Sequence, residues 1–442
     1  MESTVHVIVG AGVTGLTTAV ELEKQGKTVV ILEASKHYGG MSRSFTMDGV
    51  VFDLGPHMLM LNPNKPCGVY LRKLLRHEEM YRRRYKFEIN NGERIWRSPV
   101  TPAELLRYPA WARQDVLRSL LHRKNGNRGR PTLDNYISRR SGRKIYSSVF
   151  KPLIRKKLGK DGSDIHENWW LRPPKNVHIG GHKSPPIPGR PTPKAILGRF
   201  LHDLMPMYLY PKSGMGTVTE LLRKQFKGRL ITSCGDIRLS GSAKKITEVS
   251  FSGTELKAAS LVWTAPVREF YKALSEETPA ATETISTRLV FITFKADTLP
   301  KRPNLYTYFT GTDTVFTRVY SPRSIFRDDS PEGLEGFCFE IRSTDRIRSM
   351  SHEQLIDITA SDALRTGIAP GSIISARVID INDSSSLFAV DYLEKEKALF
   401  SAINRFSNLV FAGRHGNYFN CLLPGAVEQG LLAAERIENA SV

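Results

Sequence analysis

The amino-terminal part of the chain alternates short apolar runs with glycine-rich turns. Residues 5–9 (VHVIV) are apolar with valine at alternate positions, which is typical of a strand buried on both faces. Glycines follow at once, and residues 16–27 (LTTAVELEKQGK) carry apolar side chains at helical spacing. Residues 28–33 (TVVILE) are again apolar and predict a second strand. This order predicts a parallel strand–helix–strand unit.

Glycine-containing turns inside two alternating stretches predict β-hairpins. Residues 45–60 (FTMDGVVFDLGPHMLM) alternate around Asp48-Gly49, and residues 85–100 (YKFEINNGERIWRSPV) alternate around Asn91-Gly92. Asp-Gly and Asn-Gly are favoured in two-residue hairpin turns because both positions there require a positive φ. We therefore expect one hairpin in each stretch.

Between and beyond the hairpins the pattern is mostly helical. Residues 67–84 and 101–160 are predicted to be helical, and the second stretch has basic faces. Residues 178–194 (HIGGHKSPPIPGRPTPK) are rich in proline and glycine, which predicts either a flexible linker or a mobile loop. Residues 208–226 then predict a glycine-rich loop that enters a helix.

The second half of the chain is rich in strand patterns. Strands are predicted up to residues 262–266 (VWTAP). Residues 285–345 contain four alternating apolar runs, which should form the floor of a second domain. Residues 408–437 predict a strand, a loop and a long helix.

Composition places the chain among globular proteins, with 40% hydrophobic and 24% charged residues. No apolar stretch approaches the roughly 18 residues that span a bilayer, so no membrane span is expected. We expect no secretory signal, since Glu2 and a strand lead directly into the glycines. Four cysteines without a metal-binding spacing indicate reduced, buried thiols in a cytoplasmic protein, and no metal site is expected.

The chain is strongly basic, with a net charge of +20 and basic runs in residues 70–85, 138–157 and 172–199. Such a charge suits nucleic acid, an anionic membrane or a polyanionic small ligand. The runs lack zinc-finger, helix-turn-helix and RNA-recognition motifs, and they lack interleaved base-stacking aromatics. We therefore expect solvated surface and a few arginines that face a phosphorylated substrate, with no nucleic-acid partner.

The glycines after the first strand have the spacing of a dinucleotide-binding turn. Gly10 permits a tight turn, Gly12 lets a pyrophosphate approach the backbone, and Gly15 lets the helix lie close to the strand. The helix amino terminus offers unpaired N–H donors to that pyrophosphate. Glu33 ends the second strand, where its carboxylate can accept hydrogen bonds from ribose hydroxyls.

A second glycine pair distinguishes between dinucleotides. Residues 34–45 (ASKHYGGMSRSF) contain Gly39-Gly40 and then Arg43. An NAD-binding domain does not need this element, whereas the segment resembles that of glutathione-reductase-type flavoproteins. The resemblance is to the group that holds amine oxidases, protoporphyrinogen oxidases and UDP-galactopyranose mutases, and it implies FAD as the cofactor. The expected FAD-binding residues are Gly10, Gly12, Val13, Thr14, Gly15, Glu33, Gly39, Gly40, Met41, Ser42, Arg43, Gly55, Pro56, His57, Ile237, Arg414, Leu422, Leu423 and Ala426.

Within this group, four segments resemble UDP-galactopyranose mutases more than they resemble oxidases. Residues 54–62 (LGPHMLMLN) resemble the mutase glycine-proline-histidine loop on the flavin, with His57 as its first histidine. Residues 315–326 (VFTRVYSPRSIF) resemble the strand whose arginine grips the substrate diphosphate, which would be Arg318.

The other two segments lie in the helical region and near the carboxyl end. Residues 145–174 resemble the helices that lead to a second diphosphate arginine, for which Arg172 is the candidate. Residues 409–430 resemble the carboxy-terminal flavin segment, with Arg414 near the flavin and Tyr418 in the substrate site. The resemblance implies catalytic roles for His57, Arg172, Arg318 and Tyr418, and substrate contacts for Phe150, Arg172, Tyr306, Tyr308, Arg318, Arg323, Tyr418 and Asn420.

The resemblance implies an α/β fold in which a Rossmann-type, glutathione-reductase-like FAD domain carries an inserted sheet-plus-helix substrate domain. The chain is also too long for one ordinary core. We expect the discontinuous FAD domain to take residues 1–66, 208–284 and 405–442. Residues 67–207 should form a helical, basic insertion, and residues 285–404 an antiparallel-sheet substrate domain.

The implied activity is that of an FAD-dependent isomerase, a mutase that interconverts pyranose and furanose forms of a nucleotide sugar. In that family N5 of the reduced flavin is the nucleophile, and arginines hold the diphosphate, which suits their planar fork. The alternative is an FAD oxidase or desaturase of the protoporphyrinogen oxidase or amine oxidase type, with an apolar substrate. A third alternative is a non-catalytic FAD-stabilised scaffold that binds nucleic acid. The oligomeric state is open, with a homodimer among the options.

Overall fold

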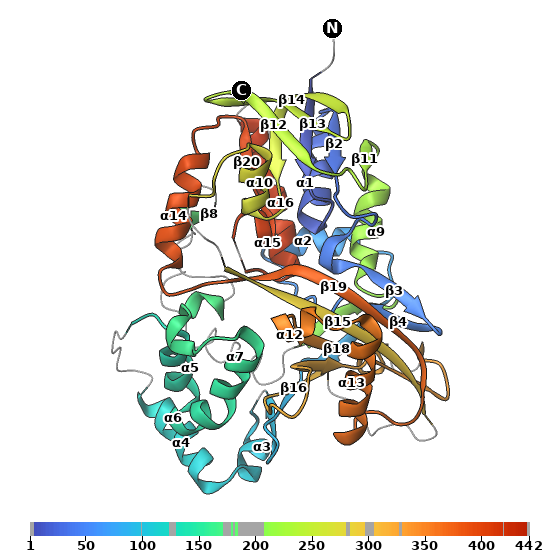
Figure 1. Cartoon of the computed structure of the whole chain (residues 1–442), viewed down its shortest axis with the longest axis vertical. Coiled ribbons are helices and arrows are strands. Elements are labelled where there is room, and N and C mark those ends of the chain that lie inside the picture. Colours follow the sequence, from blue (N-terminus) through green and yellow to red (C-terminus); the bar gives the residue numbers. More distant parts are fainter. Residues whose placement is uncertain are drawn as a thin grey trace.

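A computed structural model gives the fold of the chain (Figure 1). It describes residues 4–98, 100–122, 130–170, 178–179, 182–183, 207–279, 283–296, 305–326, 329–418 and 420–439.

The first sheet is built around parallel strands from distant parts of the chain. Its strand order is β11-β2-β1-β14-β13-β12, and β20 also pairs with β14 in parallel. The strands are β1 (Val5–Val9), β2 (Val29–Leu32), β11 (Arg229–Ile231), β12 (Ile237–Ser242), β13 (Lys245–Phe251), β14 (Thr254–Trp263) and β20 (Leu409–Phe411). The fold class is therefore α/β, as predicted, and β14 pairs in parallel with β1.

Both faces of this sheet are covered, which explains the continuous apolar runs in its strands. On one face Ile8 and Ile31 belong to a core that also includes helices α1 (Val13–Lys24), α9 (Gly216–Gln225) and α16 (Leu423–Asn439). On the other face Val7 and Val9 pack into a core with α10 (Val267–Ala273) and α14 (Tyr392–Ile403). Helix α16 lies against α1, and the two helices run together behind the sheet (Figure 1).

The second sheet is mostly antiparallel, with the order β19-β15-β18-β17-β16-β6-β7. Its strands are β6 (Phe87–Asn90), β7 (Ile95–Ser98), β15 (Glu283–Lys295), β16 (Tyr306–Phe309), β17 (Arg318–Tyr320), β18 (Leu334–Arg342) and β19 (Ile373–Leu387). Helix α13 (His352–Arg365) covers one face, where Leu355 packs on Val290 and its neighbours. The other face contributes Phe291 and Tyr320 to the core beneath α1. The two sheets therefore share one apolar core.

Both predicted hairpins are confirmed. Strands β3 (Ser44–Met47) and β4 (Val50–Asp53) pair around Asp48 and Gly49, whose φ angles are 51° and 77°. Strands β6 and β7 pair across the loop of residues 91–94, which contains Asn91-Gly92 and is longer than a two-residue turn. The second hairpin does not stay within a helical insertion, because β6 pairs in parallel with β16 and extends the second sheet.

The prediction of a helix over residues 67–84 is wrong in its second half. Helix α2 (Pro66–Leu74) is followed by β5 (Met80–Arg84), which pairs antiparallel with β10 (Met207–Pro211). No side chain of β5 is fully buried, since Met80, Tyr81 and Arg83 are partly buried and Arg82 and Arg84 are exposed, and the strand has only one neighbour in its sheet.

A helical layer occupies the lower left of the molecule in Figure 1. It contains α3 (Pro102–Arg107), α4 (Ala110–His122), α5 (Leu133–Ser141), α6 (Arg143–Ile145), the π-helical turn η2 (Tyr146–Phe150) and α7 (Lys151–Leu158). The remaining elements are η1 (Gly40–Ser42), η3 (Gly162–Asp164), η4 (Glu167–Trp169), β8 (His178–Ile179), β9 (His182–Lys183), α11 (Arg323–Phe326), α12 (Asp345–Arg348) and α15 (Gly413–Gly416). Apart from β8 and β9, the proline-rich stretch 178–194 lies outside the described residues.

Among the described residues, no helix is both long and apolar enough to cross a bilayer. Nor do these residues bring together three histidine, cysteine or acidic side chains that could hold a metal ion. The four cysteines are buried free thiols, as predicted.

Candidate functional site

The glycine-rich turn after β1 is tightly packed at two positions and open at the third. A Cβ on Gly10, whose φ is 102°, would lie 2.3 Å from Oγ1 of Thr264. A Cβ on Gly15 would lie 2.0 Å from the main-chain oxygen of Gly10. A Cβ on Gly12 would meet no heavy atom within 4 Å. Gly10 and Gly15 are thus required by the fold itself, whereas Gly12 borders open space at the start of α1.

Glu33 braces the same turn from the end of β2. Its Oε2 accepts a hydrogen bond from the main-chain N–H of Ala11 at 2.8 Å, and its Oε1 accepts one from Ser35 at 2.8 Å. Each carboxylate oxygen has a second lone pair, so the side chain can still accept hydrogen bonds from ribose hydroxyls.

The second glycine pair lies directly on the first turn. The N–H of Gly39 donates to the main-chain oxygen of Ala11 at 2.8 Å, and a Cβ on Gly40 would lie 3.3 Å from Cα of Gly12. Gly39 and Gly40 both have positive φ, 101° and 56°. Met41 and Ser42 follow in η1, and Nε of Arg43 donates to the main-chain oxygen of Gly40 at 3.1 Å. This double turn fits an extended dinucleotide such as FAD.

The start of α16 meets the start of α1. Thr14 Oγ1 donates to the main-chain oxygen of Ala426 at 3.0 Å. Leu422 precedes α16, and Leu423 is its first residue and is buried. These contacts place the predicted carboxy-terminal cofactor residues beside the glycine-rich turn. Ile237 begins β12 at the edge of the first sheet, opposite Phe251.

His57 connects the glycine-proline-histidine loop to η1. Its Nε2 lies 2.9 Å from the main-chain oxygen of Met41. Since that oxygen can only accept, Nε2 carries the proton and Nδ1 keeps its lone pair when the ring is neutral. Burial lowers the pKa of His57, and the charges of Arg318 and Arg414 lower it further, against the opposing effects of Asp53 and Met41. The ring is therefore neutral at pH 7.

Asp53 fixes the start of the glycine-proline-histidine loop. This residue was not identified from the sequence. Its carboxylate accepts hydrogen bonds from the hydroxyls of Ser44 and Tyr210 and from the N–H of Met215. Burial raises its pKa, although these hydrogen bonds and His57 oppose that shift. The main chain of Asp53 is also held, because its oxygen accepts from the Tyr320 hydroxyl at 2.8 Å.

Arg318 lies beside the same loop on β17. Its Nη2 forms an ion pair with Glu340, which is its cross-strand partner on β18, and lies 4.0 Å from the position of a Cβ on Gly55. Its guanidinium lies 5.1 Å and 5.6 Å from the ring centroids of Tyr306 and Tyr308. Burial alone would lower the pKa of Arg318, but Glu340 outweighs burial and the pKa is raised. The arginine is fully charged, held on two aromatic rings.

Arg323, another predicted substrate-binding residue, makes contacts within the protein instead. Arg323 is held as a structural cation, with Nε 2.6 Å from the buried carboxylate of Glu335 and Nη2 donating to the main-chain oxygens of Pro331 and Leu334. These contacts account for Arg323, and we therefore leave it out of the proposed substrate site.

Three more predicted residues lie near the helical layer and the segment before α16. Phe150 packs edge-on against Trp170, with ring centroids 6.2 Å apart. Nδ2 of Asn420 donates to the main-chain oxygen of Trp169 at 2.9 Å. Arg414 Nη2 donates to the Ser385 hydroxyl at 3.2 Å. Arg172 lies outside the described residues.

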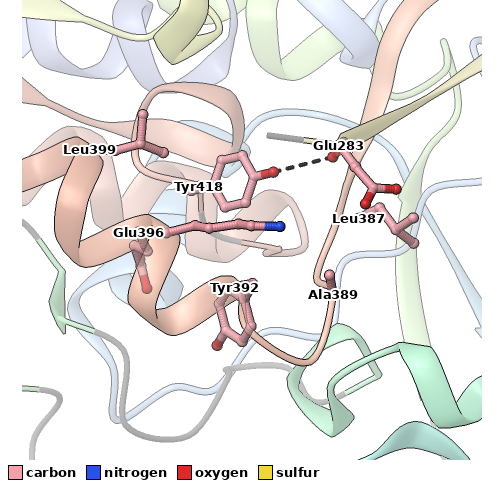
Figure 2. Close-up of a pocket in the computed structure, with 8 residues that line it drawn as sticks. Glu283, Leu387, Ala389, Tyr392, Glu396, Leu399 and Tyr418 are labelled. Carbon is pink, nitrogen blue, oxygen red and sulfur yellow. Dashed lines mark hydrogen bonds between the residues drawn. The ribbon is translucent and has the colours of Figure 1, made fainter. Parts of the chain in front are cut away.

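Tyr418 lines a pocket between β15 and α14 (Figure 2). Its hydroxyl donates to the main-chain oxygen of Glu283 at 3.1 Å, and its ring lies 5.6 Å from that of Phe388. The residue has a positive φ of 50°, which costs energy in a tyrosine. The predicted substrate contact of Tyr418 remains a proposal.

Glu396, on α14, lines this pocket and was not indicated by the sequence. It is 7% exposed, its Oε1 has no hydrogen-bond partner among the described residues, and burial raises its pKa to about 8. Tyr392, Lys395 and Glu283 also line the pocket. Glu396 is therefore protonated in the folded protein at neutral pH.

This buried acid should make stability depend on pH. The folded pKa of about 8 exceeds the unfolded value of about 4.3, so stability is present below about pH 4 and falls as pH rises toward 8. Glu396→Gln should remove about 2–4 kcal/mol of this fall between pH 5 and pH 8. Thermal melts at both pH values measure it, with the exposed Glu394→Gln on the same helix as control. Equal pH dependence in Glu396→Gln and the wild type would contradict the prediction.

Three features together define an FAD-binding protein of the glutathione-reductase type. They are the two adjacent glycine turns, the acidic residue at the end of β2 and the carboxy-terminal helix α16 that packs on α1. The chain belongs to the flavin containing amine oxidoreductase family, whose model matches residues 13–438. It is a flavin-dependent enzyme of that superfamily, and its cofactor is FAD.

Solved structures share the whole fold at low sequence identity. A reduced UDP-galactopyranose mutase superposes with a TM-score of 0.76 at 16% identity, covering 99% of this chain and 94% of that one. A putative protoporphyrinogen oxidase from Exiguobacterium sp. 255-15 gives 0.75 at 16% identity, covering 99% of each chain. Both likenesses describe the fold.

Among curated proteins, a 4,4'-diapophytoene desaturase from Staphylococcus haemolyticus is 44% identical over 54 residues. That match covers only 12% of this chain and 11% of the desaturase. It therefore carries no activity over to the chain as a whole.

Proposed function

We propose that the protein is an FAD-dependent mutase that interconverts the pyranose and furanose forms of a nucleoside-diphosphate sugar. The observation that carries this proposal is the placement of Arg318 against Gly55, two residues from His57. A charged guanidinium held at this loop suits a phosphorylated substrate. The apolar substrate of a desaturase would gain nothing from it.

The FAD would bind along the two glycine turns. Gly12 and the first turn of α1 would receive the pyrophosphate, and Glu33 the adenosine ribose. The loop from Gly55 to His57 would lie at the flavin. When bound and reduced, the flavin supplies the nucleophile of the reaction.

The side chains of this loop and of β17 would then do three things. Arg318 would hold the diphosphate both as it leaves the sugar and as it returns, because its fork can bind two phosphate oxygens at once. Tyr306 and Tyr308 would fix the plane of that guanidinium. His57, neutral and with Nε2–H tied to Met41, would present the Nδ1 lone pair without adding a charge.

The second candidate function is an FAD oxidase or desaturase. One observation favours it, because the family model that matches the chain describes amine oxidoreductases. This reaction would remove a hydride from an organic substrate and pass the electrons to oxygen or another acceptor.

Turnover with the flavin in each redox state separates the two. The holoenzyme reduced with dithionite should convert UDP- or GDP-sugars with no net oxidation, as followed by chromatography of the pyranose and furanose forms, and the oxidised enzyme should not. Conversion of an apolar or amine substrate by the oxidised enzyme, with consumption of oxygen and no isomerisation of any nucleotide sugar, would reject the mutase.

A further inference from the structure

A second cation lies beside Arg318, and the sequence did not indicate it. The Nζ of Lys157, on α7, lies 4.9 Å from the ring centroid of Tyr308 and donates to its hydroxyl at 3.5 Å. Arg318 donates to the same hydroxyl from Nη1 at 3.4 Å. Lys157 from helix α7 and Arg318 from strand β17 thus both donate to the phenol oxygen of Tyr308.

With the phenol of Tyr308 protonated, as its role as hydrogen-bond acceptor for both cations allows, the charges in this cluster do not cancel. Glu340 is ion-paired with Arg318 and also acts on Lys157, so one carboxylate faces two cations. The phenol of Tyr306 is neutral, because burial raises its pKa well above the ordinary value. A surplus positive charge that is partly removed from water is costly unless an anion comes to it.

The cluster is desolvated but still reachable. Lys157, Tyr308 and Arg318 are each half-buried rather than fully enclosed. Burial lowers the pKa of Lys157, and the nearby charge of Arg318 lowers it further, which an incoming anion would reverse. Nε of Arg318 is buried without a hydrogen-bond partner among the described residues, so the guanidinium has an N–H donor that is not used within the protein.

We propose that Lys157 is the second cation of the substrate's anion site, so that Lys157 and Arg318 together hold a phosphate or diphosphate group. The identity of the reaction rests on the proposed function, whereas the anion site rests on these contacts alone. Tyr308 orients both cations through its hydroxyl. Arginine supplies a fixed fork and lysine a point charge with three rotatable donors, a combination that can follow a diphosphate as it moves.

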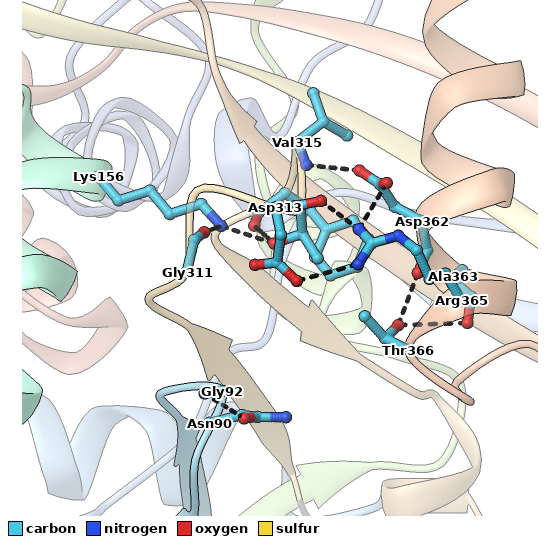
Figure 3. A network of polar contacts seen from close by, with 12 residues as sticks. Asn90, Gly92, Lys156, Gly311, Asp313, Val315, Asp362, Ala363, Arg365 and Thr366 are labelled. Carbon is cyan, nitrogen blue, oxygen red and sulfur yellow. Dashed lines mark hydrogen bonds and ion pairs between the residues drawn. The ribbon is translucent and has the colours of Figure 1, made fainter.

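The residue before Lys157 provides a matched control. Lys156 Nζ donates to the main-chain oxygen of Gly311 at 2.6 Å and to Oγ1 of Thr314 at 2.7 Å. Figure 3 shows this lysine directed at the loop that Arg365 and Asp313 also hold together. Lys156 is thus a neighbouring lysine on the same helix with a structural role.

The test is to titrate oxidised holoenzyme with inorganic pyrophosphate and with UDP, followed by isothermal calorimetry and flavin difference spectra. Lys157→Met should weaken binding roughly 10- to 100-fold, and Lys157→Arg should stay within about threefold of wild type. Lys156→Met should bind as wild type does but melt at a lower temperature.

Each contrary result has a distinct meaning. Unchanged affinity in Lys157→Met, or equal loss in Lys156→Met, overturns the inference, as does a wild type that binds neither probe. Normal affinity with a shifted flavin reduction potential also overturns it and assigns Lys157 to the flavin. Lysine-dependent binding without isomerisation of any nucleotide sugar supports the anion site while rejecting the mutase.

Discussion

Replacing Arg318 by methionine should lower kcat/KM for the nucleotide-sugar reaction roughly 100- to 1,000-fold while the flavin remains bound. The guanidinium would hold charge that develops on the leaving diphosphate, and removal of one such preorganised donor has an effect of about this size. Methionine keeps the length and the apolar packing on Tyr306 and Tyr308 but not the charge. Steady-state kinetics of the reduced enzyme measure the loss.

The variant needs two controls, because Arg318 also neutralises Glu340. Leaving that carboxylate half-buried and unpaired costs about 3–5 kcal/mol, so the double variant Arg318→Met/Glu340→Gln separates folding from chemistry. Arg365→Met removes an arginine from the ion pairs with Asp313 and Asp362 and should leave kcat/KM unchanged. Near-normal turnover in the stable double variant would exclude Arg318 from the site.

Gly12→Val should give a folded, colourless protein with FAD affinity reduced by at least about 100-fold. The backbone at Gly12 is extended, with φ of −77° and ψ of −177°, which valine adopts readily, and its Cβ would meet no heavy atom within 4 Å. The added methyl groups would instead fill the space next to the first N–H groups of α1, which a pyrophosphate has to approach.

Thermal shift with and without added FAD measures this prediction. A cofactor that binds only the folded state stabilises it by an amount that grows with the logarithm of its free concentration relative to Kd, so the wild type should gain stability with FAD and Gly12→Val should gain much less at the same concentration. Gly15→Val provides the contrast. Its side chain would overlap the main-chain oxygen of Gly10, so this variant should fail to fold whether or not FAD is present. A yellow Gly12→Val protein would show that the pyrophosphate does not approach this turn.

The parts of the fold that local sequence encodes were predictable. The glycine spacing in residues 10–15 and the Asp48-Gly49 turn depend on φ angles and close approaches that only a few residue types tolerate. Strand β5 was not predictable, because MYRRR has a mixed pattern and becomes a strand only through its pairing with β10, which comes much later in the chain.

Candidate site residues could be named from the sequence only where a single residue carries the signal. Resemblance makes Arg318 a candidate, but its ion-pair partner Glu340 depends on the register between β17 and β18. Lys157 sits in a basic run in which every lysine looks alike, and only the packing of α7 against Tyr308 distinguishes it from Lys156. Glu396 is one acid of an ordinary amphipathic helix, and its burial depends on tertiary contacts.

The packing of α16 on α1 has a consequence for synthesis on the ribosome. Gly430 lies so close to α1 that a Cβ there would be 2.8 Å from the main-chain oxygen of Thr14, so the apolar side of α1 has its proper cover only after residues 25–422 have been translated. At about 5–20 residues per second, that interval lasts some tens of seconds. Nascent chains should therefore depend on a chaperone until α16 has been translated, and fragments that stall before it should aggregate.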